Sequence, residues 1–522
     1  MPLRSPLNRQ RAIWALLALS ALLCFFAGLG GYPLFDLDEG AFSEATREMF
    51  ERGDFIATYL NGEPRFDKPI LIYWLQAIAV ALLGVTEWAF RLPSAVAATL
   101  WAAGILVFAR RYVDRDSAWT APLFMMTTLV VIVIGRAATA DALLNLWLAL
   151  TLLDIYRYYT TPSRAVALRV YLWMGLGFLT KGPVAVALPL LVSAAFYVWS
   201  GHWRRLLAAV FYPPGWAVFL AVALPWYALI YLDQGQAFID GFFLKHNIGR
   251  FSDTMEQHGG SVLYYVGLLP LVLLPHTGLF LRLLPMLASL RRGTLDQFLW
   301  IWFGVVFLLF SFSQTQLPHY ILYGCTPLFL LMARYRERLR SRWLAYVPVV
   351  FIFALLAALP ELVALAQPYT PAAYESALLE RATGAFGTAY RVWTLGGLAV
   401  ALILPFLRGL APWQGLIAAG LIQALVVMQA VVPALAYIQQ QPVVEAARFA
   451  RGLDANVVGY RFRMPSFSVY RGAVTPEREP RPGEVVVTRV GKLEDLGPHA
   501  VIFRRGGVVM ARMKETTPGD AE

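Results

Sequence analysis

The chain has 522 residues, of which 58% are hydrophobic and 15% are charged, and its formal net charge is +11. Soluble proteins carry about 25% charged residues, so this composition excludes an ordinary soluble protein and indicates one that is embedded in a bilayer. The positive charge does not indicate a nucleic-acid partner, because the arginines stand in short clusters between apolar segments, as topology signals do. Cys24 and Cys325 both lie inside apolar segments, which argues against a disulfide framework.

The apolar segments predict a helical membrane protein with about thirteen spans. The first, residues 12–30, follows three arginines but lacks a small-residue cleavage site, so we expect a retained signal anchor. The segment 70–84 is short and lies beside a charged stretch, so we expect it to be an interfacial helix. The further expected spans are residues 92–108, 118–134, 142–155, 170–180, 184–199, 207–232, 262–280, 298–312, 320–332, 344–362, 392–407 and 413–433.

The arginine clusters predict the orientation of these spans, since short cytoplasmic loops collect Lys and Arg. With a cytoplasmic N-terminus every expected inside loop is basic, including 110–115 and 334–342. A true span at 70–84 would place both of these clusters outside, which favours the count of thirteen. An odd number of spans then exports the C-terminal tail.

The chain is expected to divide into a transmembrane domain at residues 1–435 and a tail at 436–522. In the tail, short alternating apolar patterns are separated by Pro and Gly, which is typical of strands in a small α/β domain. A helix near 443–453 would complete that domain, and the tail shows no catalytic cluster. The predicted class is an all-α polytopic membrane protein with a small soluble α/β domain. The strands are expected at 456–460, 485–487 and 501–503.

The first outside loop, residues 31–91, carries the carboxylate pair Asp38-Glu39 directly after a span. A carboxylate so close to the hydrocarbon is costly unless it is paired, metal-bound or hydrated, so the pair is a candidate functional site. The alternative is that both acids are solvated and that Asp38 caps the helix that follows. Composition alone does not decide between the two interpretations.

Other polar residues also fall on the outside face in this topology. Some have ordinary structural explanations, since Asp141 could cap a helix and Lys181 could extend to the interface. Arg250 could pair with Asp253. The restriction of the whole set to one face is the stronger signal, because unrelated structural residues would be spread over both faces. The set comprises Asp141, Lys181, His246, Asn247, Arg250, Gln314, Gln316, His319 and Tyr320.

Five short motifs on this face belong together. They are Asp38-Glu39, Phe66-Asp67-Lys68-Pro69 ahead of Tyr73-Trp74, Leu179-Thr180-Lys181-Gly182-Pro183, His246 to Arg250-Phe251, and Leu317-Pro318-His319-Tyr320. This set resembles the ArnT-like branch of the dolichyl-phosphate-mannose protein mannosyltransferase superfamily, which has the GT-C type of fold. The best-known activity of that branch is transfer of 4-amino-4-deoxy-L-arabinose from undecaprenyl phosphate to lipid A. The resemblance covers most of the chain, including the span count and the small tail.

The resemblance also implies roles for single residues. Asp38 corresponds to the catalytic carboxylate of the family and Lys68 to the lysine of its lipid-phosphate pocket. Arg250 and Tyr320 would help to hold that phosphate. The candidates are therefore Asp38, Glu39 and Asp141 for catalysis, Lys68, Arg250, Tyr320 and Lys181 for the lipid phosphate, and Asp67 and His246 for a divalent metal ion.

Two positions depart from the family pattern. The family often has Arg two places after the acid pair, where this chain has Ala41, so one phosphate contact is either missing or supplied by Arg47 or Arg65. The acid before the lysine is usually Glu and is here Asp67, which leaves a metal site formed with His246 in question.

The resemblance implies an inverting glycosyltransferase that moves a sugar from a polyprenyl (undecaprenyl) phosphate donor to an envelope acceptor, with lipid A as the expected acceptor. The expected location is the bacterial cytoplasmic (inner) membrane, with the active site facing the periplasm. Cations would stabilise the departing phosphate, and a carboxylate would orient or deprotonate the acceptor. Such a donor is already activated, and the sequence has no P-loop glycine motif for a nucleotide.

Three other classes are alternatives, and one of them, a purely structural scaffold, would not explain why the polar residues lie on one face. A protein O-mannosyltransferase shares the first-loop acid pair but usually carries a large exported insert, which this sequence lacks. A lipid or sugar transporter would place ionisable groups near the middle of the bilayer on broken helices, whereas here they cluster in the outside loops.

Overall fold

The computed structural model describes residues 6–249, 261–370 and 372–515. Within these residues, six helices are long and apolar enough to cross a membrane, and four further apolar helices of 10–17 residues are shorter. The chain is therefore a multi-pass membrane protein, while the count of thirteen spans stays a prediction. The six long helices are Asn8–Phe26, Glu87–Tyr112, Pro213–Gln234, Arg342–Tyr369, Thr388–Phe406 and Pro412–Arg451.

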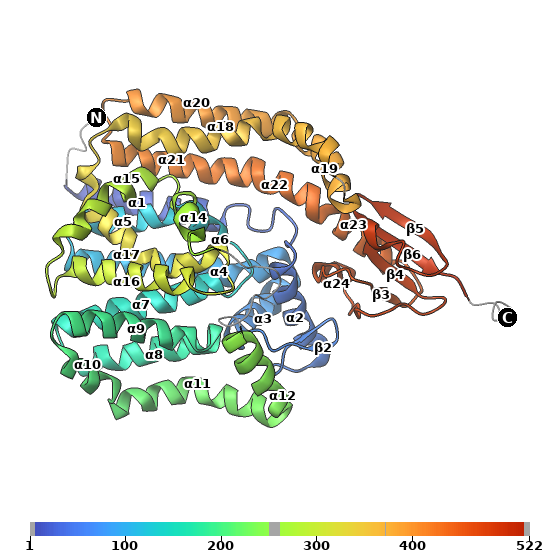
Figure 1. Ribbon diagram of the computed structural model, residues 1–522, viewed down its shortest axis with the longest axis horizontal. Helices are drawn as coiled ribbons and strands as arrows, with labels where there is room; N and C mark the ends of the chain where they lie inside the picture. The colour runs from blue at the N-terminus through green and yellow to red at the C-terminus, as the bar shows by residue number, and fades with distance from the viewer. Residues whose placement is uncertain (1–5, 250–260, 371, 516–522) are drawn as a thin grey trace.

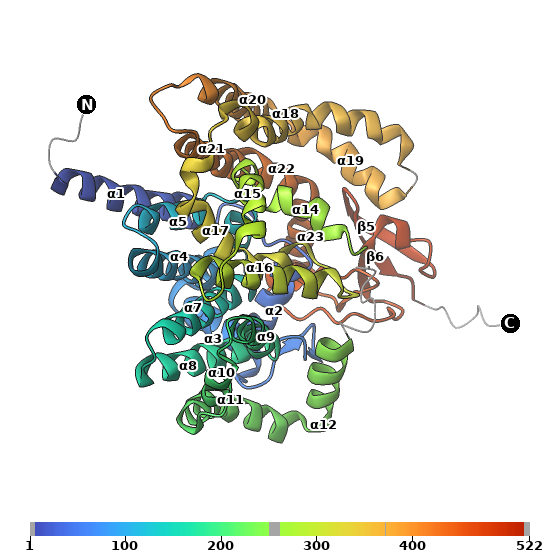
Figure 2. The same cartoon turned by 60° about the vertical axis from the view of Figure 1, so that its left-hand side comes forward.

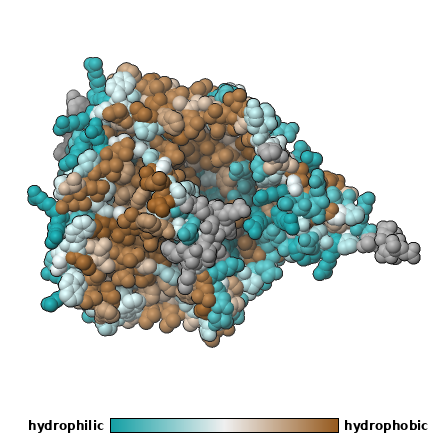
Figure 3. All heavy atoms as spheres, viewed as in Figure 1, coloured by the Kyte–Doolittle hydropathy of each residue, from teal (hydrophilic) through white to brown (hydrophobic). Residues whose placement is uncertain are grey.

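The membrane region is a bundle of roughly aligned helices whose visible outer face is largely hydrophobic (Figure 1, Figure 3). Its helices are α1 (Pro6–Ala21), α4 (Glu87–Tyr112), α5 (Ser117–Met126), α6 (Leu129–Ile134), α7 (Asp141–Thr160), α8 (Arg164–Lys181), α9 (Val184–Trp199), α10 (Trp203–Val210), α11 (Pro213–Gln234), α12 (Gln236–Phe238), α14 (Tyr264–Val272), α15 (Thr277–Leu283), α16 (Leu295–Ser311), α17 (Thr326–Arg334), α18 (Arg342–Ala366), α19 (Ala373–Ala385), α20 (Thr388–Ile403), α21 (Pro412–Val426) and α22 (Val432–Leu435).

The bundle has a clear order of neighbours. Helix α7 packs against α4 and α8, and α8 packs in turn against α11. In both ribbon views α18 and α20 lie at one edge of the bundle and α11 lies at the opposite edge (Figure 1, Figure 2). The elements of the first loop gather at the end of the bundle that faces the C-terminal tail (Figure 1).

Two expected spans are interrupted, and the two interruptions contact each other. The span 118–134 breaks between α5 and α6, and the span 262–280 breaks between α14 and α15. The backbone N–H of Leu129 donates to the carbonyl of Leu274 at 2.8 Å, and Thr127 Oγ1 lies 2.9 Å from His276 Nε2. Backbone groups inside a bilayer need partners within the protein, so each break supplies what the other lacks.

The first loop folds into α2 (Asp38–Arg52), the hairpin β1 (Tyr59–Leu60) and β2 (Glu63–Pro64), and α3 (Leu71–Leu83). The hairpin turns at Asn61-Gly62, where φ is 55° and 91°, because Asn and Gly tolerate positive φ best. Helix α3 confirms the helix expected at 70–84, and it packs against α2 and α4. Its position at the membrane interface stays a prediction.

The tail forms a small α/β unit. Its sheet has the order β3-β4-β6-β5, with β3 parallel to β4 and the other pairs antiparallel. The expected strands and the expected helix near 443–453 are confirmed, whereas β6 was not expected. The helical path from Pro412 to Arg451 is continuous, so the proposed boundary at 435/436 falls inside a helix. The elements are α23 (Gln441–Arg451), β3 (Val457–Gly459), α24 (Ser466–Arg471), β4 (Val485–Arg489), β5 (His499–Arg505) and β6 (Val508–Met513).

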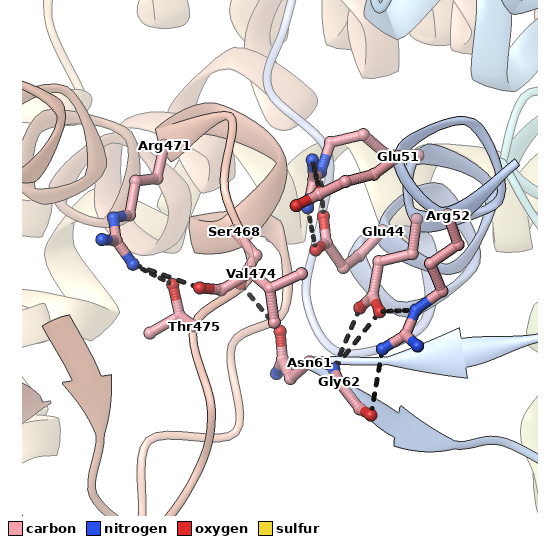
Figure 4. Close-up of polar contacts among 11 residues, drawn as sticks. Glu44, Glu51, Arg52, Asn61, Gly62, Ser468, Arg471, Val474 and Thr475 are labelled. Atoms are coloured by element: carbon pink, nitrogen blue, oxygen red, sulfur yellow. Dashed lines mark hydrogen bonds and ion pairs between the residues drawn. The ribbon is translucent and has the colours of Figure 1, made fainter. Parts of the chain in front are cut away.

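A polar seam joins the tail to the first loop. We define the seam by the contacts that α24 makes with residues 34–61 and with the start of α4. Ser466 donates to the Asp36 carboxylate through both its backbone N–H and its hydroxyl group. Ser468 Oγ lies 2.7 Å from Asn61 Oδ1, as Figure 4 shows, and Tyr470 Oη accepts from the backbone N–H of Leu34 at 2.7 Å. The tail therefore holds the loop that carries the Asp38-Glu39 pair.

Candidate active site

Asp38 is an exposed carboxylate at the first position of α2. The residue before it, Leu37, is the N-cap, and no side chain caps this helix. The alternative that Asp38 caps the helix is therefore not observed. Within the described ranges no hydrogen bond or ion pair holds its carboxylate, which is close enough to Arg65 and His319 to influence their charges. Asp38 is thus placed to meet a ligand.

Glu39, by contrast, is buried and fully engaged. Its Oε1 accepts from Arg91 Nε and from the backbone N–H of Ala138, both at 2.8 Å. Its Oε2 accepts from Arg91 Nη2 at 2.7 Å and from the backbone N–H of Phe35 at 2.9 Å. A carboxylate with four donors has no capacity left to take a proton from a substrate, so this geometry gives Glu39 a structural role. Its role in catalysis stays an untested prediction.

Arg91 completes this structural centre, and sequence reasoning did not single it out. Besides Glu39, its guanidinium donates to the carbonyls of Leu29, Tyr32 and Pro33, each at 2.8 Å. The side chain is fully buried. Arg91 and Glu39 together fix the path by which the chain leaves the first span and enters α2.

Asp141, at the start of α7, and Lys181, at the end of α8, form a polar cluster that is separate from the Glu39–Arg91 pair. Lys181 Nζ donates to Asp141 Oδ1 at 2.6 Å and to Tyr323 Oη at 2.8 Å. Tyr323 Oη donates to the same carboxylate oxygen at 2.8 Å, and His319 Nε2 lies 3.5 Å from it. Asp141 and Lys181, which were expected on one face of the membrane, are in direct contact, and Tyr323 was not expected beside them.

Tyr320 lies beside this cluster. Its ring centroid is 5.2 Å from Lys181 Nζ and 4.9 Å from the ring of His319. Lysine has three N–H donors, and the contacts with Asp141 and Tyr323 use two of them, so one donor can still point at an anion. Lys181 and Tyr320 are therefore consistent with a phosphate pocket.

Lys68 reaches the same region from the first loop. It stands on the segment after β2, is partly buried, and donates to the carbonyl of Asp67 at 3.1 Å. Its charge acts on His319, as does the charge of Asp38, so His319 links the first loop to the Asp141 cluster. Lys68 and Asp38 of the first loop and the Asp141 cluster of the bundle thus lie near His319, although they come from different parts of the chain.

The metal prediction receives no new support. Asp67 is paired with Arg65 at 3.3 Å, while the side chain of His246 and the whole of Arg250 lie outside the described residues. Within the described part of the chain, no group of three or more His, Cys, Asp or Glu side chains is arranged to hold a metal ion. The assignment of Asp67 and His246 to a divalent metal ion stays a prediction.

Asp36, which lies in the seam just before α2, has a shifted pKa. Burial of the Asp36 carboxyl group raises its pKa from 3.8 to about 7, and hydrogen bonds from Ser466 oppose that rise. Asp36 precedes Asp38 by two residues, so the seam is coupled to the position of the candidate catalytic acid.

Comparisons with known proteins show which fold and which relatives this chain resembles. Residues 67–229 match the family model of the dolichyl-phosphate-mannose-protein mannosyltransferases. Superposition on the crystal structure of ArnT from Cupriavidus metallidurans bound to undecaprenyl phosphate gives a TM-score of 0.79 at 20% identity, over 95% of this chain and 97% of that one. The apo state gives 0.78 at 21% identity, over 97% and 98%. The chain has the ArnT fold.

Curated relatives of this chain are named as arabinosyl transferases. The chain is 32% identical to the undecaprenyl phosphate-alpha-4-amino-4-deoxy-L-arabinose arabinosyl transferase of Serratia proteamaculans, over 62% of this chain and 59% of that protein. It is 34% identical to the transferase of that name from Aeromonas hydrophila, over 61% and 59%. The match thus spans about 59% of the length of these relatives. The predicted resemblance to the ArnT-like branch and its GT-C type fold is confirmed.

Proposed function

We propose that this chain is an inverting membrane glycosyltransferase that moves a sugar from a polyprenyl phosphate donor, such as undecaprenyl phosphate, to an envelope acceptor. The observation that carries the proposal is Asp38, an exposed carboxylate without an internal partner among the described residues, standing close to Arg65 and His319 in an ArnT fold. The names of the relatives support the same activity.

The site residues suit the departure of a lipid phosphate. As the bond between the anomeric carbon and the phosphate oxygen breaks, negative charge grows on the phosphate, and nearby cations stabilise it. Lys68 and Lys181 supply such cations from two sides, and Tyr320 borders the same space. Arg250 would add a third cation, as the family resemblance implies.

Asp38 would act on the acceptor. With a hydroxyl acceptor, the carboxylate takes the proton as the oxygen attacks the anomeric carbon from the face opposite the phosphate, which inverts the configuration. With a phosphate acceptor, which is already anionic, Asp38 instead positions the sugar or neutralises an amino group on it. Glu39 and Arg91 hold the start of α2 and thereby orient Asp38 in either case.

We further propose that the acceptor is lipid A and that the sugar is 4-amino-4-deoxy-L-arabinose, in keeping with the names of the relatives. The enzyme would then lie in the bacterial inner membrane with its active site facing the periplasm. Protein O-mannosylation is the second candidate, because residues 67–229 match the mannosyltransferase family model. A lipid or sugar transporter is a weaker third candidate.

The test is transfer by the purified protein in nanodiscs. Undecaprenyl phosphate carrying 4-amino-4-deoxy-L-arabinose serves as donor, and lipid A or a serine- and threonine-rich peptide serves as acceptor. Mass spectrometry should find the sugar on lipid A. Sugar on the peptide alone would favour the second candidate, and no transfer to either would count against the proposed function. Comparing lipid A from cells with and without the gene provides the same test in vivo.

A further inference from the structure

Arg65 is a buried cation whose hydrogen-bonding capacity is mostly unused. Its side chain is 8% exposed, and Nη2 donates to Asp67 Oδ2 at 3.3 Å. Its Nε and Nη1 have no partner among the described residues. Leaving two nitrogen atoms of a buried guanidinium without a hydrogen-bond acceptor is costly, so the arrangement calls for an oxygen atom that the protein itself does not supply.

A second unpaired polar atom lies close to it. The hydroxyl group of Tyr73 is buried and has no hydrogen-bond partner in the described part of the chain. The Tyr73 ring stacks on Phe42 with centroids 5.4 Å apart, and the Arg65 guanidinium carbon lies 5.2 Å from the centroid of that same Phe42 ring. Both unpaired groups therefore border one ring, at the second turn of the helix that Asp38 begins.

The third observation concerns Arg47, the arginine of α2 nearest to Phe42 in the sequence. All three of its nitrogen atoms bind acids of the same helix, because Nε and Nη2 bind Glu44 at 2.8 and 2.7 Å and Nη1 binds Glu51 at 2.6 Å. Arg65, in contrast, stands over Phe42, the neighbour of Ala41, and is close enough to Asp38 for their charges to interact.

We propose that Arg65 and Tyr73 bind an oxygen of a phosphate monoester beside Asp38, Arg65 through Nε or Nη1 and Tyr73 through its hydroxyl group. This inference rests on the proposed function and names two binding residues that the proposed lipid-phosphate set does not contain. The phosphate belongs either to the polyprenyl phosphate that leaves the donor or to the lipid A acceptor, since both of these are phosphate monoesters. The Arg65 guanidinium suits it because a planar fork of N–H groups matches phosphate oxygens.

The test measures binding of two probes, undecaprenyl phosphate and lipid A, to the full chain in nanodiscs. Arg65→Met should weaken one of them by about tenfold or more, as expected for one charge-assisted hydrogen bond. Arg65→Lys should retain part of the affinity, and Tyr73→Phe should lose about two- to tenfold for the same probe. The probe affected identifies the source of the phosphate.

Arg9→Met is the matched control, because Arg9 also pairs with an aspartate, Asp116, at 3.3 Å but is exposed and lies elsewhere. It should leave both affinities unchanged. Wild-type affinity for both probes in Arg65→Met and Tyr73→Phe would overturn the inference while leaving the proposed function intact. Failure of the wild type to bind either probe would overturn both. If Arg65→Met does not fold, Arg65→Lys and Tyr73→Phe decide the question.

Discussion

Two adjacent acids at the start of α2 have opposite surroundings. Asp38 is exposed and uncapped, whereas Glu39 is buried and receives four hydrogen bonds. Successive helical residues point about 100° apart, so one acid can face the bundle while the next faces the site. The two adjacent acids therefore differ in role: Asp38 is suited to react with a ligand, and Glu39 is suited to hold the fold.

The structural role of Glu39 leads to a stability prediction. Glu39→Gln should lower the free energy of unfolding by about 3–5 kcal/mol, because it leaves the buried Arg91 guanidinium without its counter-charge. The control is Glu361→Gln, since Glu361 forms an exposed pair with Arg391 that should contribute little. Thermal unfolding in detergent checks both variants. A Glu39→Gln protein of normal stability that has lost turnover would instead assign Glu39 to catalysis.

At the scale of elements, α2 lies between the bundle and the tail. Helix α24 packs against α2, and the seam holds Asp36, two residues before the start of α2, and Asn61 in the β1–β2 turn. The tail carries no predicted catalytic group, and its described residues hold the first loop through these contacts. Contacts of this kind are sensitive to small steric changes at the interface.

Gly40 is the position where this contact is tightest. A Cβ atom there would lie 2.2 Å from Asp36 Oδ1 and 2.6 Å from the backbone N of Ser466. Gly40→Ala should therefore separate the seam and increase hydrogen exchange in 466–471. Gly396→Ala is the control, because nothing lies within 4 Å of its added Cβ. Unchanged exchange in Gly40→Ala would show that the seam does not depend on this approach.

The raised pKa of Asp36 predicts how the seam responds to pH. The folded state holds the Asp36 proton up to pH about 7, whereas an unfolded chain releases it near pH 3.8. Its contribution to stability is therefore fully present below pH 3.8 and is lost as the pH rises toward 7. Asp36→Asn should remove this part of the dependence, so its melting temperature should fall less than that of the wild type between pH 4 and 7. Parallel curves for the two proteins would refute the assignment.

For the whole molecule, periodicity and charge predict the parts that depend on local sequence. The expected span 184–199 coincides with α9, and 142–155 lies inside α7. Both could be predicted because a long continuous apolar segment indicates a helix from its local sequence alone. The break at Thr127 was missed, since it depends on a carbonyl, that of Leu274, far away in the sequence. The expected boundary at 435/436 lies within a helix, because the change in composition there does not end the helical path from Pro412 to Arg451.

The site divides in the same way. Asp141 and Lys181 were predicted to share a face, and they are in contact. Their partner Tyr323 was missed although it follows Tyr320 by one 3₁₀ turn, which is a usable signal. Arg91 gave no signal, because its partner Glu39 is 52 residues away. Long-range pairs of this kind leave no local pattern.

The predicted topology can be tested on the whole chain. Reporter fusions at Arg340 and Glu522 should report opposite sides of the membrane, because thirteen spans place the basic cluster at 334–342 inside and the tail outside. A fusion at Arg111 should agree with the one at Arg340. Fusions at Arg340 and Glu522 that report the same side would contradict the thirteen-span arrangement.

The central claim is that turnover depends on Asp38, and the most direct measurement is sugar transfer by purified Asp38→Asn protein in nanodiscs, with thermal stability recorded alongside. The variant keeps the size of the side chain, and no hydrogen bond among the described residues depends on its charge, so stability should stay normal. Transfer should fall by about 10²–10⁴, the usual contribution of general-base catalysis, while affinity for undecaprenyl phosphate stays close to that of the wild type. Near-normal transfer by a stable variant would contradict the account.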